Sequence, residues 1–270
     1  PGPGFDLMEQ CAQDADCLGR VFLTGMFAVG DQVVFFADAP GKNGRKGLGG
    51  GGAATEVLAA LIRQAREEIV LQTPYLVLDR PMRAFFRRVR RDQPQLDILV
   101  STNSLAAADH DYAYAFAYKN KRFYVKDLRW RIFEFKRPPA DADQMLPLIA
   151  GVRRARNYFA CIHSKSMVID GRIVYIGSFN VDPRSANLNT ECGLVIHDAA
   201  VAGAVRADIT RDMAPRNSWT IGKKRDLPFM LSRVNTLMAT ISHWIPFVDV
   251  WPLDYAESFE LKPGQEPVPF

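Results

Sequence analysis

Residues 161–180 hold two runs rich in apolar and β-branched residues, separated by the dipeptide Asp170-Gly171. Asp-Gly between such runs is the strongest short-range signal for a β-hairpin, because both positions tolerate the positive φ angles of a tight turn. A two-residue turn at this dipeptide pairs Ile169 with Arg172 across the strands. We therefore predict a hairpin, which constrains the fold more than any other stretch.

The polar side chains of the two runs meet at the open end of this predicted hairpin. The turn places His163 opposite Ser178, and opposed residues share a face of the sheet. That face continues toward the turn with Met167 and Val174. We therefore expect one polar cluster, made of His163, Lys165, Ser178 and Asn180.

These residue types suit attack on a phosphodiester, which needs a nucleophile, a proton donor for the leaving alkoxide and donors for the charged oxygens. A neutral imidazole at His163 can attack phosphorus, and an imidazolium can donate the proton. Lys165 and Asn180 offer donors to the substrate phosphate, and Ser178 can add another. A lone His-x-Lys on a strand pair would instead be a satisfied histidine beside a snorkelling lysine.

The full spacing decides between these alternatives. His-x-Lys, four residues, Asp, six residues and Gly-Ser-x-Asn resemble the signature of the phospholipase D superfamily at every defined position. The following residues, 181–191, resemble bacterial cardiolipin synthases and end in Glu191. In the superfamily such a glutamate orients the catalytic imidazole. The resemblance therefore implies five catalytic candidates: His163, Lys165, Asp170, Asn180 and Glu191.

Asp170 belongs to the motif but lies apart from the predicted polar cluster. The hairpin places it at the turn, roughly 20 Å from His163 at about 3.3 Å per residue. We therefore expect Asp170 to form the turn or to pair with a neighbouring group.

The chain carries one His-x-Lys motif, whereas members of the superfamily use two across a pseudo-twofold axis. His110, His197 and His243 are not followed by lysine two residues later. The second motif must therefore come from a symmetric partner chain, as in a homodimer, or from a missing N-terminal half.

The resemblance implies the α/β fold of a phospholipase D-like half-unit, a mixed β-sheet flanked by helices. We predict three regions. Residues 1–52 are the tail of a preceding half and a Gly-rich linker, in which residues 38–42 resemble the connector of type C cardiolipin synthases. Residues 53–200 are the catalytic domain. Residues 201–270 are a C-terminal aromatic and basic extension, helical in part over 227–244.

Apolar periodicity and end signals predict the elements of the catalytic region. Thr55 is expected to cap the first helix. The expected helices are 55–67, a basic helix after Pro81 and 199–213, and the expected strands are 68–72, 96–101, 130–135 and 192–196.

A formal net charge of +4 suits an anionic membrane surface or nucleic acid, but also an ordinary solvated surface. The apolar stretch 18–36 carries charged residues, which argues against a spanning helix. The extension combines cations with tryptophans, as in an interfacial element or a tail packed over the domain. The resemblance implies peripheral attachment to the cytoplasmic side of a bacterial inner membrane.

The function that the resemblance favours is cardiolipin synthase-like phosphatidyl transfer, or phospholipase D-type hydrolysis, on a phospholipid through a phosphohistidine intermediate. This chemistry requires neither a metal nor a cofactor. One alternative is a nuclease or phosphodiesterase of the same superfamily, and another is a noncatalytic half that needs its missing partner. The sequence leaves the lipid donor and acceptor open.

Overall fold

The computed structural model describes residues 9, 12–18, 32–42, 51–109, 111–145, 160–226, 228, 230–231, 233–234, 237 and 259–270. Its strands are β1 (Val33–Ala37), β2 (Glu68–Gln72), β3 (Asp97–Asn103), β4 (Arg131–Phe135), β5 (Ser166–Ile169), β6 (Ile173–Gly177), β7 (Cys192–His197), β8 (Ser218–Ile221) and β9 (Glu260–Leu261). Its α-helices are α2 (Ala15–Leu18), α3 (Ala53–Gln64), α4 (Arg80–Asp92), α5 (Asp111–Lys119), α6 (Ala142–Met145), α8 (Pro183–Asn187) and α9 (Ala199–Asp212). A short 3-10 helix, η2 (Leu105–Ala107), and a short π-helix, η3 (Phe123–Asp127), complete the helical elements that the structure describes.

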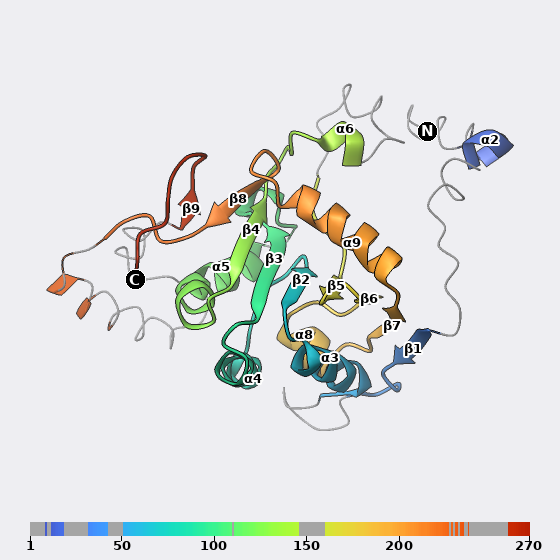
Figure 1. The fold of residues 1–270 in the computed structure, drawn as a ribbon, viewed down its shortest axis with the longest axis horizontal. Coiled ribbons are helices and arrows are strands. Elements are labelled where there is room, and N and C mark those ends of the chain that lie inside the picture. Colours follow the sequence, from blue (N-terminus) through green and yellow to red (C-terminus); the bar gives the residue numbers. More distant parts are fainter. Residues whose placement is uncertain are drawn as a thin grey trace.

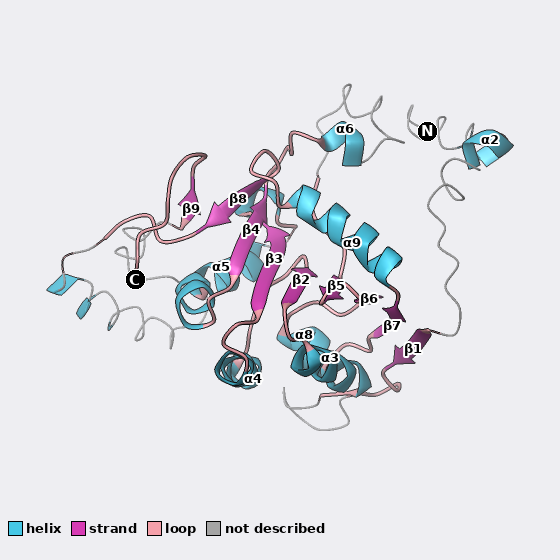
Figure 2. Ribbon diagram, viewed as in Figure 1, coloured by secondary structure: helices cyan, strands magenta, loops and turns pink. Residues whose placement is uncertain are grey.

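All the described strands belong to one mixed sheet, in the order β1-β7-β6-β5-β2-β3-β4-β8-β9. Strands β2, β3 and β4 run parallel, and the other neighbours pair antiparallel. Helix α9 covers one face, while α3 and α4 cover the other (Figures 1 and 2). The predicted fold class, a mixed sheet flanked by helices, is therefore confirmed.

Apolar residues alternate between the two helical layers along the central strands. Val70 and Val168 pack in the layer under α9, whereas Ile69 and Met167 pack in the layer under α3 and α4. Because a strand buried on both faces is apolar throughout, these strands appear in the sequence as continuous hydrophobic runs.

The hairpin forms, but the predicted register is wrong by one residue. Ile169 pairs with Ile173 instead of Arg172, so three residues connect the strands. Asp170 and Gly171 have the expected positive φ angles of 49° and 62°, and the Arg172 amide donates to the Ile169 carbonyl at 3.0 Å. Because apolar residues occupy both faces of the hairpin, the apolar pattern fits either register and cannot select one.

This slip also corrects the predicted faces of the hairpin. Met167 pairs with Tyr175, so Met167 and Val174 lie on opposite faces. Strand β5 begins only at Ser166 and β6 ends at Gly177. The predicted polar residues therefore lie on irregular segments that adjoin the strand ends, and not on alternating strand positions.

Helix α3 begins at Ala53, and Thr55 does not cap it. The Thr55 hydroxyl donates to the Ala186 carbonyl of α8 at 3.0 Å, and the Ala54 amide donates instead to the carboxylate of Asp38 at 2.9 Å. The beginning of α3 is thus fixed by residues distant in sequence.

Strand β1 comes from the predicted tail-and-linker region, and β8 and β9 come from the predicted extension. The division into three regions stays a prediction. The expected helix at 227–244 lies largely outside the described residues, as do Trp244 and Trp251. Among the described helices, none has the length and apolar character that crossing a membrane requires.

Candidate active site

The residue before His163 is held by the last residue of β3. The Asn103 side chain donates to the Ile162 carbonyl at 2.9 Å and accepts the Ile162 amide at 2.8 Å. Both residues are buried. The side-chain amide of Asn103 thus makes the two hydrogen bonds that the backbone of a neighbouring strand would make. This contact places His163 beyond the carboxyl end of β3, the edge at which open α/β sheets bind ligands.

Lys165 contacts His163 directly. Its Nζ lies 3.2 Å from Nδ1 and 3.3 Å from Nε2 of the imidazole, and it donates to the His163 carbonyl at 2.7 Å. Nζ is nearly equidistant from the two ring nitrogens, so it lies beside the imidazole without being aligned with either one alone. The arrangement places a lysine amino group next to an imidazole, which can attack phosphorus when neutral and can donate a proton as imidazolium.

The charge environment of Lys165 is mixed. Partial burial lowers the pKa of Lys165, and the carboxylates of Glu191 and Asp109 act in the opposite direction without cancelling it. The amino group of Lys165 thus lies close to several acids and is only partly shielded from solvent.

Ser178 and Glu191 form a second pair of the predicted site. The Ser178 hydroxyl donates to the Glu191 carboxylate and accepts the Cys192 amide at 3.0 Å. Glu191 is buried. Within the part of the chain that the structure describes, no hydrogen bond joins Glu191 to His163, so the expected contact with the imidazole is not formed in this conformation.

Asn180 is anchored through its backbone. Its amide donates to the Ser185 hydroxyl at 3.1 Å, and its side chain hydrogen-bonds Asp182. Its Oδ1 atom is buried and accepts no hydrogen bond from the described residues. Asp182 caps α8 by accepting the Ser185 amide at 2.8 Å, and burial, reinforced by the charge of Glu191, raises its pKa despite these hydrogen bonds.

Asp170 lies at the far end of the hairpin, as its place in the turn requires. Its carboxylate accepts the consecutive amides of Arg66, Glu67 and Glu68, at 2.8 to 3.2 Å. Burial by itself raises the pKa of Asp170, but these hydrogen bonds outweigh burial and lower it. Strand β5 separates Asp170 from Lys165, so the structure does not bring Asp170 into the polar cluster.

Three residues near the cluster were absent from the predicted set. Asn103 positions Ile162, and the Tyr75 hydroxyl donates to the Asp109 carboxylate at 2.8 Å. Asp109 in turn acts electrostatically on Lys165. Asn103 ends the parallel strand β3 and Tyr75 follows the parallel strand β2, so both lie at the edge of the sheet where open α/β folds bind ligands.

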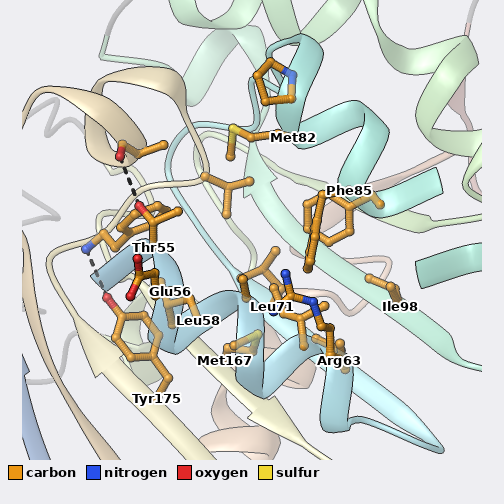
Figure 3. Close-up of a pocket in the computed structure, with 18 of the residues that line it drawn as sticks. Thr55, Glu56, Leu58, Arg63, Leu71, Met82, Phe85, Ile98, Met167 and Tyr175 are labelled. Carbon is orange, nitrogen blue, oxygen red and sulfur yellow. Dashed lines mark hydrogen bonds between the residues drawn. The ribbon is translucent and has the colours of Figure 1, made fainter. Parts of the chain in front are cut away.

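A cavity of about 420 Å³ lies between α3, α4 and the sheet (Figure 3). Leu58, Leu71, Met82 and Phe85 are among its mostly apolar lining residues, and none of the polar site residues lines it. Its wall includes Phe179, whose amide donates to the Tyr175 hydroxyl at 3.0 Å. The cavity thus borders the segment that carries Asn180 without being part of the polar cluster. No group of acids, histidines and cysteines suited to a metal occurs among the described residues.

Comparison with known proteins gives a consistent result. Residues 58–213 match the family model described as the cardiolipin synthase, PLD-like domain. Cardiolipin synthase C of Escherichia coli K12 is 37% identical over 136 residues, which cover 50% of this chain and 27% of that protein. The minor cardiolipin synthase ClsB of Bacillus subtilis 168 is 27% identical over 157 residues, which cover 58% of this chain and 33% of that protein.

Among solved structures, the match to NucT from Helicobacter pylori covers 69% of this chain and 97% of the NucT chain, at 16% sequence identity and a TM-score of 0.49. The matches to the two cardiolipin synthases span about a third of those proteins or less. The family match confirms the resemblance drawn from the His-x-Lys signature.

Proposed function

This chain belongs to the family of cardiolipin synthase, phospholipase D-like domains, and from that premise we propose that it contributes one half of a site for phosphatidyl transfer between phospholipids. The observation that carries the proposal is the contact between Lys165 and the imidazole of His163, on a segment fixed by Asn103. The lysine can donate to the oxygens of a phosphodiester, and the imidazole beside it can attack phosphorus or transfer a proton.

The proposed reaction proceeds in two displacements. A histidine nitrogen attacks phosphorus, an N–P bond forms, and the P–O bond to the first alcohol breaks as a second histidine protonates the leaving oxygen. The second histidine then takes a proton from the hydroxyl of another lipid or of water. The oxygen of that hydroxyl attacks phosphorus and releases the first histidine.

The residues of the polar cluster and Glu191 have distinct roles in this scheme, whereas Asp170 has none. By analogy with the family, His163 acts chiefly as the acid and base, and in a homodimer it must serve as nucleophile as well. Lys165 and Asn180 hold the phosphate oxygens. Ser178 was expected to bind phosphate too, but its hydroxyl is directed at Glu191. We therefore assign Ser178 to holding the Glu191 carboxylate, whose charge acts on Lys165.

The second His-x-Lys motif comes either from an N-terminal half or from a second copy of this chain. The anionic surface of a bacterial inner membrane is the partner we propose for the protein, with attachment at the cytoplasmic side. The net charge of +4 supports attraction to such a surface.

The test is product analysis after incubation of the purified chain with phosphatidylglycerol liposomes, with and without phosphatidylethanolamine. His163→Ala is the active-site variant, and His197→Ala, at an exposed position at the end of β7, is the matched control. We expect cardiolipin from the unmutated chain and from His197→Ala, and none from His163→Ala.

Other products would change the conclusion in defined ways. Phosphatidate without cardiolipin would replace transfer with hydrolysis. Cleavage of DNA or RNA without lipid turnover would contradict the lipid substrate. Absence of any turnover by the folded chain would rule out two copies as a sufficient unit, and the measurement would be repeated after addition of a separately produced first half.

A further inference from the structure

A buried ion pair outside the His-x-Lys motif lies against the candidate site. Lys42 Nζ is 2.7 Å from the carboxylate of Asp38, and the two side chains are 1% and 0% exposed. Burial by itself raises the pKa of Asp38, but the contacts with Lys42 and with the amides of Ala54 and Glu191 outweigh burial and lower it. These contacts therefore favour the carboxylate form of Asp38, and the pair lies in a segment to which the proposed reaction assigns no role.

Asp38 binds both backbone groups of Glu191. The Asp38 amide donates to the Glu191 carbonyl at 2.8 Å, and the Glu191 amide donates back to the Asp38 carboxylate at 3.0 Å. These bonds continue the pairing of β1 with β7 by one residue, since Ala37 already pairs with Cys192. Glu191 is thus fixed in position by a residue more than 150 positions earlier in the chain.

Lys42 reaches the other side of the site. Its Nζ donates to the Ser185 carbonyl at 2.6 Å, and the Ser185 hydroxyl accepts the amide of Asn180. Nζ also lies 5.7 Å from the ring centroid of Phe179, the residue before Asn180. One ion pair therefore contacts the supports of two motif residues, Glu191 through Asp38 and Asn180 through Lys42.

We propose that Asp38 and Lys42 are positioning residues of this site, which together set the separation and orientation of Glu191 and Asn180. The catalytic consequence rests on the function proposed above, whereas the structural linkage does not. Neither residue contacts the imidazole or the site of phosphate binding. Small displacements of catalytic and binding groups lower reaction rates strongly, since a shift of about 1 Å can reduce a rate about 100-fold.

Gly52 has no side chain, and the Asp38–Lys42 pair occupies the space that a side chain at this position would fill. A Cβ atom at this position would lie 2.5 Å from Asp38 Oδ1 and 2.6 Å from Lys42 Cε. Gly52→Ala therefore displaces the pair without removing either charge. Gly203, in α9, has nothing within 4 Å of such an atom and provides the matched control.

The chain also contains a second buried lysine–carboxylate pair that serves as a control. Lys121 Nζ is 2.8 Å from Glu134, with side-chain exposures of 2% and 3%, and it lies between α5 and β4. Lys42→Met and Lys121→Met each remove the ammonium from a buried pair and keep the aliphatic volume. Because both pairs are buried, both variants should lose stability.

The experiment compares these variants by hydrogen–deuterium exchange of the full chain and by turnover of phosphatidylglycerol. We expect Lys42→Met and Gly52→Ala to speed exchange of the Asn180 and Glu191 amides at least about tenfold relative to Lys121→Met and Gly203→Ala. We also expect kcat to fall about tenfold or more with KM changed less than about twofold, because binding groups remain while their alignment is lost.

Unchanged exchange at Asn180 and Glu191 in the Lys42 and Gly52 variants would overturn the proposal, whatever the turnover. Faster exchange with undiminished kcat would overturn the positioning role and leave a structural one. If the unmutated chain shows no turnover by itself, two copies do not suffice for the proposed function, and the exchange data still decide whether the pair fixes these residues. Should Lys42→Met fail to fold, the milder Gly52→Ala decides the outcome.

Discussion

The sharpest structural prediction concerns Asn103. Asn103→Ala removes the donor to the Ile162 carbonyl and the acceptor of the Ile162 amide, both in a buried environment. Leaving a buried backbone group without a partner costs about 1–3 kcal/mol. Water that enters the site can partly replace the lost partners. For two such groups we therefore expect a loss of about 2–4 kcal/mol in the free energy of unfolding.

Urea denaturation measures this loss, and Asn217→Ala is the matched control. Asn217 is also fully buried, and its side chain bonds Asp141 and the Arg211 carbonyl away from the site. Both variants should lose stability, but only Asn103→Ala should also speed amide exchange around His163 and lower turnover. A loss below about 0.5 kcal/mol for Asn103→Ala, or equal effects of both variants at His163, would refute the reasoning.

Three further predictions follow from single residues. Asp170→Asn should lower the free energy of unfolding by about 1 kcal/mol at neutral pH, measured by urea titration, because three amides lose a charged acceptor. The pKa of Asp170 is lower in the folded chain than in the unfolded chain, so this contribution is present above the unfolded pKa of about 3.9 and is lost as pH falls through the folded pKa. The variant and the unmutated chain should therefore have similar free energies of unfolding in acid. Gly177→Ala places a Cβ atom against the Cys192 carbonyl and should cost about 1–3 kcal/mol, whereas Gly203→Ala should not destabilise the chain; thermal unfolding distinguishes them. Lys165→Met should abolish turnover. In the unmutated chain, turnover should decline on the alkaline side at a pH below the usual pKa of lysine, about 10.4, because burial lowers the Lys165 pKa. A decline that begins only at or above that pH would contradict the assignment.

The sequence was sufficient for several of the local elements and for the family to which the chain belongs. Strands β2 and β4, the helix after Pro81 and helix α9 lie where apolar periodicity and end signals predict them. The His-x-Lys signature identified His163 and Lys165, which the structure brings into contact. Spacing carries this information because the motif residues flank the two strands of one hairpin.

The sequence was insufficient where the structure depends on contacts between distant segments. The hairpin register could not be chosen, because apolar residues occupy both faces of β5 and β6. The partner of Glu191 was also missed. Its backbone is fixed by Asp38 and its carboxylate by Ser178, and nothing in the local pattern around residue 191 indicates either contact.

The central claim is that His163, Lys165 and Asn180 form a binding site for a phosphodiester. The most direct measurement is an NMR titration of the His163 ring protons with dimethyl phosphate, in the unmutated chain and in Lys165→Met. We predict a saturable shift at His163 that is lost in Lys165→Met, with no shift at His197. An equal shift in both proteins, or a shift at His197 but not at His163, would contradict the assignment of this site.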